Sequence, residues 1–300
     1  MSEWDAELVV DAQLARGLIH EQFAPLPRHS IERLAEGWDY IAFLVDGEWV
    51  FRFPRREVVV PGTEREIAVL PELAALLPVS VPAPVYVGRA GDRFRWPFYG
   101  ARFLPGLEVA EAGLDDGDRV SLARPLAAAL RALHSEDVLG AVGDSLPADP
   151  LGRADMRLRV PRTRNALEAI ADVWQRPPAV DEILAAASKL SSPAATAVVH
   201  GDLHVRQLLT DGVRLSGIID WVDVCRSDPG VDLQLLWSFL PASGRAAFLG
   251  EYGGVPEESL LRARVLALFL NAILLRHARA EGLAGVATEA LTGLERTAVD

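Results

Sequence analysis

The residue pattern changes at Pro105-Gly106, a pair typical of turns, in this chain of 300 residues. Most structured segments before the pair have the composition of β-strands, and most segments after it have helical patterns. Strands followed by helices, instead of the two alternating along the chain, predict an α+β fold. We expect one domain over residues 1–103 and a second, mostly helical one over residues 104–300.

In the first part of the chain, an Asp46-Gly47 pair separates two β-rich segments. The pair predicts a tight hairpin, because both central residues of such a turn need positive φ. Pro54 is expected to end the second strand. The full set of expected elements is a helix at 7–23, strands at 31–34, 40–45, 48–53, 85–88 and 98–104, and a helix from 63 towards 77 that contains Pro71.

One β element interrupts the helical part, and it lies between His200 and Trp221. Its Asp211-Gly212 pair again predicts a two-residue turn. The other expected elements after residue 105 are helices at 121–134, 165–174, 181–190 and 229–240, with one more within each of 256–279 and 286–297.

The register of this second hairpin determines which side chains meet. If Thr210 lies opposite Val213, Gln207 lies opposite Ser216, and Asp220 comes roughly opposite Leu203. The register therefore predicts that Asp202 and Asp220, which are far apart along the chain, lie at the same end of one hairpin.

Three side chains of this element suit phosphoryl transfer. That reaction needs a carboxylate that orients and deprotonates the attacking hydroxyl, and oxygen ligands for the magnesium that bridges the phosphates. Asp202, Gln207 and Asp220 supply such groups. The order of a His, an Asp two residues later, an amide five residues after that, and a later Asp at a strand end is typical of a kinase catalytic loop and its metal ligand.

On these residues the chain resembles the aminoglycoside and macrolide phosphotransferases, a family with a protein-kinase-like fold. The matching segments stand in family order and at family spacing over about residues 30–240. They are Gly37-Trp38-Asp39-Tyr40, Trp49-Val50-Phe51-Arg52-Phe53-Pro54-Arg55-Arg56, His200-Gly201-Asp202, Ile218-Ile219-Asp220-Trp221, and Asp228-Pro229 through Asp232-Leu233.

The resemblance implies two lobes: a mostly antiparallel N-terminal lobe that binds nucleotide, and a helical C-terminal lobe for catalysis and substrate binding. It implies that Asp202 is the catalytic base and that Asp220 is a ligand of Mg²⁺, with GTP or ATP as the phosphate donor. Gln207 stands where most members carry asparagine. A glutamine also offers a carbonyl oxygen to a metal, on a longer arm.

For the nucleotide site, the resemblance implies that Arg52 replaces the usual phosphate-binding lysine and that Glu66 is its partner on the following helix. An arginine keeps the charge but binds phosphate with a planar fork. Gly37 marks the flap over the nucleotide, and Ala101 and Phe103 lie at the hinge, where backbone groups meet the purine.

Several of these residues also have plain structural explanations. Asp202 would then be a turn residue after a glycine, and Asp220 would end a strand. Glu66 would close a capping box that begins at Thr63 and would bond backbone instead of Arg52. Asp228 and Asp232 are expected to be structural.

Histidine and cysteine give little sign of other chemistry. His200 and His204 flank the base, but no third zinc ligand stands at a recognisable spacing, and His200 is expected to support the loop. His134 ends an apolar helix and is taken as structural. Cys225 is the only cysteine, so an internal disulfide is impossible; no base is expected beside it, which argues against a nucleophile.

Charge and hydropathy exclude several partners. The net charge of −12 disfavours nucleic acid, which binds basic surfaces. Residues 1–5 are acidic and polar, unlike a signal peptide. The longest apolar run, Val265–Leu275, is too short to span a bilayer. We therefore expect a cytoplasmic protein without membrane or nucleic-acid partners, and a monomer, since one chain holds the whole expected site.

The acceptor is predicted from the sequence after the last motif. Two apolar runs, 233–240 and 266–270, favour a largely apolar acceptor, although such runs are usually helix cores. Acidic residues, which a polycationic aminoglycoside needs, are sparse there. The motifs at 37–40 and 49–56 also resemble those of macrolide phosphotransferases, which commonly prefer GTP.

The expected reaction is therefore transfer of the γ-phosphate of GTP, or of ATP, to the 2'-hydroxyl on the amino sugar of a macrolide, giving antibiotic resistance. An aminoglycoside phosphotransferase or a kinase of a small metabolite is the first alternative. A nucleotide-binding pseudokinase is the second, because Arg52 and Gln207 replace the usual lysine and asparagine.

Overall fold

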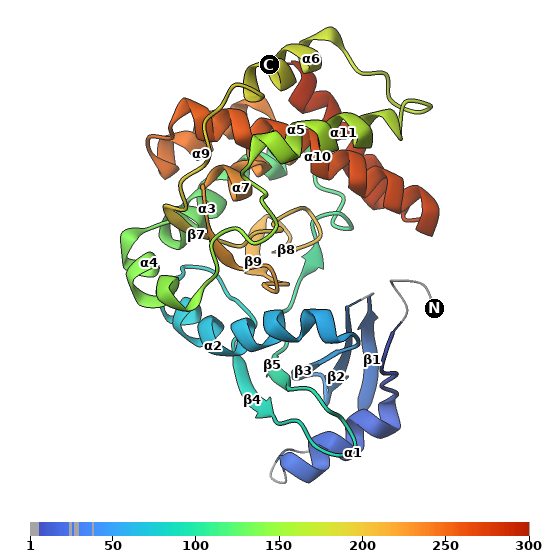
Figure 1. The fold of residues 1–300 in the computed structure, drawn as a ribbon. Coiled ribbons are helices and arrows are strands. Elements are labelled where there is room, and N and C mark those ends of the chain that lie inside the picture. The colour runs from blue at the N-terminus through green and yellow to red at the C-terminus, as the bar shows by residue number, and fades with distance from the viewer. Residues whose placement is uncertain (1–5, 24–25, 27–29, 38, 300) are drawn as a thin grey trace. The chain divides into compact units, whose positions relative to one another are not determined.

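The computed structural model describes residues 6–23, 26, 30–37 and 39–299. Trp38 of the first motif and residues 1–5 therefore lie outside the described residues. The chain divides into two compact units, one of Met1–Ala75 and Val81–Leu104 and the other of Leu76–Ser80 and Pro105–Asp300 (Figure 1).

Among its described residues, the first unit contains an antiparallel sheet in the order β1-β2-β3-β5-β4. The elements of this unit are α1 (Ala12–Gln22), β1 (Ile31–Glu36), β2 (Tyr40–Val45), β3 (Trp49–Pro54), a 3-10 turn (Glu57–Val59), α2 (Val60–Leu76), β4 (Pro84–Gly88) and β5 (Phe98–Arg102). The α1 helix begins later than expected, at the Asp11 cap, whose side chain accepts from the amide of Leu14 at 2.7 Å.

The hairpin between β2 and β3 forms as predicted. Asp46 and Gly47 both take positive φ, 50° and 67°, and the amide of Glu48 donates to the carbonyl of Val45 at 3.0 Å. The inward side chains of these strands build an aromatic core in which Phe53 stacks on Phe98 with ring centroids 4.6 Å apart.

The capping box expected at Thr63 is wrong. The α2 helix begins at Val60, so Thr63 and Glu66 lie inside it. The hydroxyl of Thr63 lies within hydrogen-bond distance of the phenol of Tyr40, at 3.0 Å, and donates to the carbonyl of Val59 at 3.3 Å. The backbone of the preceding 3-10 turn leads directly into the helix and takes the place of a side-chain cap.

The second unit is mostly helical. Its helices are α3 (Asp116–Leu133), α4 (Glu136–Val142), a 3-10 turn (Gly143–Ser145), α5 (Met156–Glu168), α6 (Pro178–Ala187), α7 (Gly230–Leu233), α8 (Leu235–Ser238), α9 (Ala242–Tyr252), α10 (Glu257–Glu281) and α11 (Ala284–Val299). Among the described residues, no helix is long and apolar enough to cross a membrane.

Some helices differ from the prediction. The helix expected at 165–174 lies at Met156–Glu168, because Asp155 caps it by accepting from the amide of Arg157 at 3.0 Å. The helix expected at 229–240 is split into α7 and α8. The α4 and α9 helices were not predicted.

The β elements of this unit are short. The β7 strand (Ala197–Val199) pairs with β10 (Cys225–Ser227), and β8 (Leu208–Asp211) lies between β6 (Leu107–Glu108) and β9 (Arg214–Ile218). These strands flank the segments that contain Asp202, Gln207 and Asp220.

The predicted register of the β8–β9 hairpin is wrong. Asp211 pairs with Arg214, so the turn is made by Gly212 and Val213, and Thr210 pairs with Leu215. Gly212 takes a φ of 60° at the first central position, which is typical of a type II′ turn. An irregularity between Leu209 and Thr210 shifts the register further.

Candidate active site

Asp202 lies in the loop that follows β7, and a buried carboxylate binds the backbone of this loop. The buried carboxylate of Asp232, in α7, accepts from the amide of His200 at 2.7 Å and from that of Gly201 at 3.1 Å. Gly201 has a φ of 94°, and a Cβ there would lie 2.3 Å from the carbonyl oxygen of Asp223. The loop therefore requires glycine at this position, and Asp232 has the structural role expected of it.

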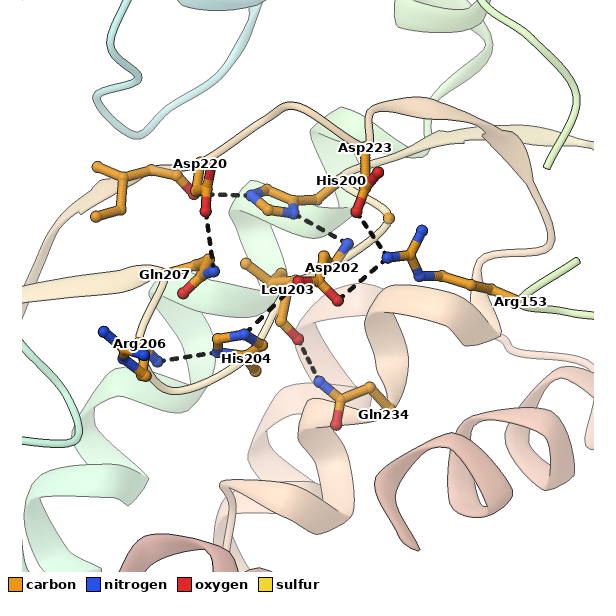
Figure 2. Close-up of polar contacts among 12 residues, drawn as sticks. Arg153, His200, Asp202, Leu203, His204, Arg206, Gln207, Asp220, Asp223 and Gln234 are labelled. Carbon is orange, nitrogen blue, oxygen red and sulfur yellow. Dashed lines mark hydrogen bonds and ion pairs between the residues drawn. The ribbon is translucent and has the colours of Figure 1, made fainter. Parts of the chain in front are cut away.

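His200 links this loop to the segment that carries Asp220. Its Nδ1 atom accepts from the amide of Asp202 at 3.3 Å, and its Nε2 atom donates to the carbonyl of Ile219 at 2.9 Å (Figure 2). The imidazole is fully buried and packs on Trp221 with ring centroids 4.6 Å apart. Both ring nitrogens are thereby used, which excludes the zinc pair with His204 and gives His200 the supporting role expected of it.

Gln207 and Asp220 lie directly beside each other. The amide of Ile219 donates to the carbonyl of Gln207 at 2.9 Å, and the side-chain Nε2 of Gln207 is 3.4 Å from Oδ2 of Asp220. Asp220 itself takes a φ of 64°, which turns the chain at the end of β9. Gln207 thus lies opposite Ile219, not opposite Ser216 as predicted, because of the shifted register.

Asp220 and Gln207 suit a magnesium ion by their chemistry. Magnesium prefers oxygen ligands and is usually held by one or two protein groups together with water and phosphate oxygens. A carboxylate and a neighbouring side-chain amide provide such ligands. The described residues contain no group of three or more His, Cys, Asp or Glu side chains that could hold a metal by themselves.

The charges around Asp202 favour its ionised form. Its Oδ1 atom is 3.3 Å from Nη2 of Arg153, and its Oδ2 atom is 3.7 Å from Nε2 of His204. Burial raises the pKa of the Asp202 carboxyl, but His204, Arg153 and His200 together outweigh burial and lower this pKa below its ordinary value. Asp202 is therefore a carboxylate at neutral pH, as a proton acceptor must be.

Sequence reasoning missed Arg153 and Asp223. Arg153 donates to both Asp202 and Asp223, yet it lies 49 positions before Asp202 in the chain and in no motif. No local signal could have found it. Asp223 follows Asp220 by three positions, so a search for carboxylates near the predicted metal ligand would have included it.

In the first unit, Arg52 and Glu66 form an ion pair. The Nη1 atom of Arg52 is 2.7 Å from Oε1 of Glu66 and 3.2 Å from the hydroxyl of Tyr99. The guanidinium lies over the ring of Tyr40 at 4.4 Å from its centroid. Burial, and after it the carboxylate of Glu66, raise the pKa of Tyr40 well above its ordinary value, so Tyr40 stays neutral beneath the cation.

The remaining predicted residues lie in or beside the sheet of the first unit. Gly37, between β1 and β2, donates its amide to the carbonyl of Tyr40 at 2.9 Å, and its own carbonyl accepts from Arg55. Ala101 lies in β5 and pairs with Val50 of β3 and Pro84 of β4, and the amide of Phe103 donates to the carbonyl of Glu48 at 2.7 Å. The role of these three residues towards a nucleotide stays a prediction.

Residues 30–266 match the phosphotransferase enzyme family, also named APH. The chain belongs to this family. No curated protein matches the chain in sequence.

Solved structures of phosphotransferases resemble the chain over almost its whole length. The GDP and kanamycin complex of APH(2")-IIia is 26% identical, with a TM-score of 0.65 over 94% of this chain and 97% of its own. The GDP complex of wild-type aminoglycoside 2'-phosphotransferase-IIIa is 24% identical, with a TM-score of 0.68 over 96% and 98%. The macrolide 2'-phosphotransferase MphH from Brachybacterium faecium, as apoenzyme, is 22% identical, with a TM-score of 0.61 over 95% and 97%. These findings confirm the kinase-like α+β fold.

Proposed function

We propose that this phosphotransferase transfers the γ-phosphate of GTP or ATP to the 2'-hydroxyl on the amino sugar of a macrolide, and so confers antibiotic resistance. The observation that carries the proposal is the arrangement in Figure 2: an ionised Asp202 joined through His200 to the segment of Asp220, with Gln207 beside Asp220. A proton acceptor and oxygen ligands for a phosphate-bound cation are the parts that phosphoryl transfer requires.

In this proposal the residues of the chain divide the work. Asp202 orients the acceptor hydroxyl and accepts its proton, and the Asp232 carboxylate holds the loop of Asp202 in place. Arg52, fixed by Glu66, binds nucleotide phosphate. Asp220 and Gln207 would hold magnesium, which neutralises charge on the phosphates when it is bound.

The nucleotide is proposed to be GTP before ATP. Similar phosphotransferases have been solved with GDP, while the aminoglycoside enzyme APH(2")-IIa has been solved with ATP and streptomycin. The macrolide-like motifs of the first unit add to the preference for GTP.

The structure removes one argument for the macrolide. The apolar runs at 233–240 and 266–270 are mainly interior residues of the second unit, as the burial of Leu235, Leu236, Phe239, Leu266 and Leu268 shows. They therefore say nothing about the acceptor. Support for the macrolide comes from the motifs at 37–40 and 49–56, and the similarity to two macrolide 2'-phosphotransferases at 22% identity agrees in fold.

A second candidate acceptor is an aminoglycoside. It is favoured by the similarity to the kanamycin complex of APH(2")-IIia, at 26% identity. Such an acceptor carries several ammonium groups, whereas a macrolide presents one dimethylamino group, so the two classes are easily separated by assay.

The test is to incubate purified protein with Mg²⁺, either nucleotide and a panel of macrolides and aminoglycosides, and to detect addition of one phosphoryl group by mass spectrometry. Phosphorylation of macrolides, faster with GTP, is the expected result. Gain of phosphate on kanamycin-type compounds alone would reverse the choice of acceptor. Binding of nucleotide without any transfer would instead indicate a pseudokinase.

A further inference from the structure

Arg153 lies between two carboxylates of the candidate active site. Its Nη2 atom is 3.3 Å from Oδ1 of Asp202 and 2.7 Å from Oδ2 of Asp223 (Figure 2). The side chain is only 14% exposed. Burial disfavours its charge, but Asp202 and Asp223 outweigh burial and raise the pKa of Arg153 above its ordinary value. The site therefore contains a permanent cation shared by two anions.

The segment that carries Arg153 is fixed to the body of the unit. The Oδ1 atom of Asp149 accepts from the amide of Arg153 at 2.8 Å, and its Oδ2 atom accepts from the next amide at 2.9 Å. The amide of Asp149 donates to the carbonyl of Arg226 in β10 at 2.8 Å. On the other side, the guanidinium of Arg159 donates to the carbonyl of Gly152 at 3.1 Å. Arg153 is thus presented by an anchored loop.

We propose that Arg153 is a positioning residue for the Asp202 base, and that Asp223 limits how strongly Arg153 holds it. This inference rests on the proposed function, because Asp202 needs a fixed orientation only if it accepts a proton. The shorter contact goes to Asp223 and the longer one to Asp202. Asp202 is therefore oriented without being locked in a tight ion pair, which would make it a weaker base.

Phosphoryl transfer explains why the Asp202 carboxylate needs a residue that orients it. Proteins catalyse phosphoryl transfer mainly by positioning and by electrostatics, and a misplacement of about 1 Å can cost about 100-fold in rate. Oδ2 of Asp202 lies 3.7 Å from Nε2 of His204, which is too long for a hydrogen bond. The contact from Arg153 is the one that orients the carboxylate.

Removal of Arg153 and removal of Asp223 are expected to shift the pKa of Asp202 in opposite directions. The charged and titratable groups around Asp202 include His204 and His200 in its own loop, Arg153 before α5 with Asp223 on its other side, and Arg159 within α5. Arg153→Met removes a cation and is expected to raise the pKa of Asp202. Asp223→Asn leaves Arg153 to Asp202 alone and is expected to lower it.

The first measurement needs no activity. The pKa of Asp202 is followed by NMR in protein with ¹³C-labelled aspartate carboxyls, with the resonance assigned by its absence in Asp202→Asn. Wild type, Arg153→Met and Asp223→Asn are compared. Arg157→Met is the matched control, because Arg157, four positions after Arg153, is exposed and pairs with Asp155, and the change is expected to leave the pKa of Asp202 unaltered.

The second measurement is kinetic. Arg153→Met is expected to lower kcat about 100-fold while the KM for nucleotide changes little, and to move the acid limb of the pH profile to higher pH. Arg153→Lys is expected to restore much of kcat, since a single nitrogen makes both contacts and a lysine is a point charge. A merely structural arginine would show neither the shift of the limb nor the rescue.

The outcomes separate this inference from the proposed function. If Arg153→Met leaves the pKa of Asp202 in place, or if Asp223→Asn shifts it in the same direction, the inference is overturned even in an active enzyme. If wild type phosphorylates no acceptor, the proposed function fails, and the positioning role, which presupposes that function, is overturned with it. Opposite shifts with the loss and rescue of kcat would establish the role.

Discussion

A mostly buried arginine bound to a carboxylate occurs in each unit. In the first unit the carboxylate supports the arginine, and in the second unit the arginine supports the carboxylate. In the first unit, Arg52 faces Glu66, which is fully buried, and the rings of Tyr40 and Tyr99 hold the guanidinium. In the second unit, Arg153 is shared between Asp202 and Asp223. Arg52 is bound by a buried carboxylate and lies against two aromatic rings, whereas Arg153 is bound by two carboxylates.

The difference separates two uses of the same pair of groups. In the first unit the carboxylate is the support, and the arginine is the group proposed to meet the nucleotide. In the second unit the arginine is the support, and the carboxylate of Asp202 is proposed to act. A buried carboxylate fixes the cation in the first unit, whereas the shared cation of the second unit leaves its anion ionised and oriented but able to accept a proton.

The largest effect is expected from Asp202→Asn. The amide keeps the shape of the side chain but cannot accept the hydroxyl proton, so kcat should fall at least about 100-fold, as general bases typically contribute this much or more. Steady-state kinetics with acceptor and nucleotide measure it. Arg153 keeps its shorter contact with Asp223, so thermal unfolding should change little.

The control for this change is Asp155→Asn, which replaces the cap of α5 by an equally good capping residue. It should leave both activity and stability unaltered. If Asp202→Asn retained activity within about tenfold of wild type, the assignment of the base would be wrong.

The next largest effect is expected on stability in the first unit. Arg52→Met leaves the Glu66 carboxylate buried without its guanidinium, and removing one partner of a buried ion pair typically costs about 3–5 kcal/mol. Denaturant unfolding measures this cost. The same variant should also weaken nucleotide binding, because the guanidinium proposed to bind the nucleotide phosphate is lost.

A double variant separates the two roles of Arg52. Arg52→Met with Glu66→Met replaces both charges by apolar groups and should regain most of the stability, while nucleotide affinity stays low. Recovery of affinity together with stability would show that Arg52 only stabilises the fold, and that the comparison between the units fails.

A smaller effect is expected from Asp220→Ala. Loss of a carboxylate ligand should lower the magnesium-dependent part of nucleotide affinity about 100-fold, at the upper end of what changes around metal sites cost. Calorimetry with and without Mg²⁺ measures it, and Arg157→Met serves again as the exposed control. An unchanged dependence on magnesium would remove Asp220 from the metal site.

Local chemistry made part of this structure predictable. Asp46-Gly47 forms the expected turn with positive φ at both positions, and the Asp46 side chain, which accepts from the amide of Ser30 at 2.7 Å, supports the turn. The same dipeptide at Asp211-Gly212 was misassigned by one residue, since β8 also pairs with β6 and contains an irregularity. Tertiary pairing outweighed the turn propensity there.

The candidate site also contains residues that the sequence predicted and residues that it did not. Asp202, Gln207 and Asp220 lie within one short segment, and motif spacing was enough to bring them together even with the wrong register. The sequence predicted a structural role for Asp232 but not that its carboxylate binds the loop of Asp202. Arg153 depends on a loop held by β10, and such a contact between distant segments leaves no pattern in the sequence.

The smallest effect concerns Cys225, which lies in β10 near the shared cation. Burial raises the pKa of its thiol to about 12, although Arg153 acts to lower it. The unfolded thiol ionises above about pH 8.5 while the folded one does not, so wild type should lose about 2 kcal/mol of stability relative to Cys225→Ala between pH 7 and pH 10. Urea unfolding of both proteins measures this difference. An equal response would mean that burial does not keep the thiol of Cys225 protonated in the folded protein.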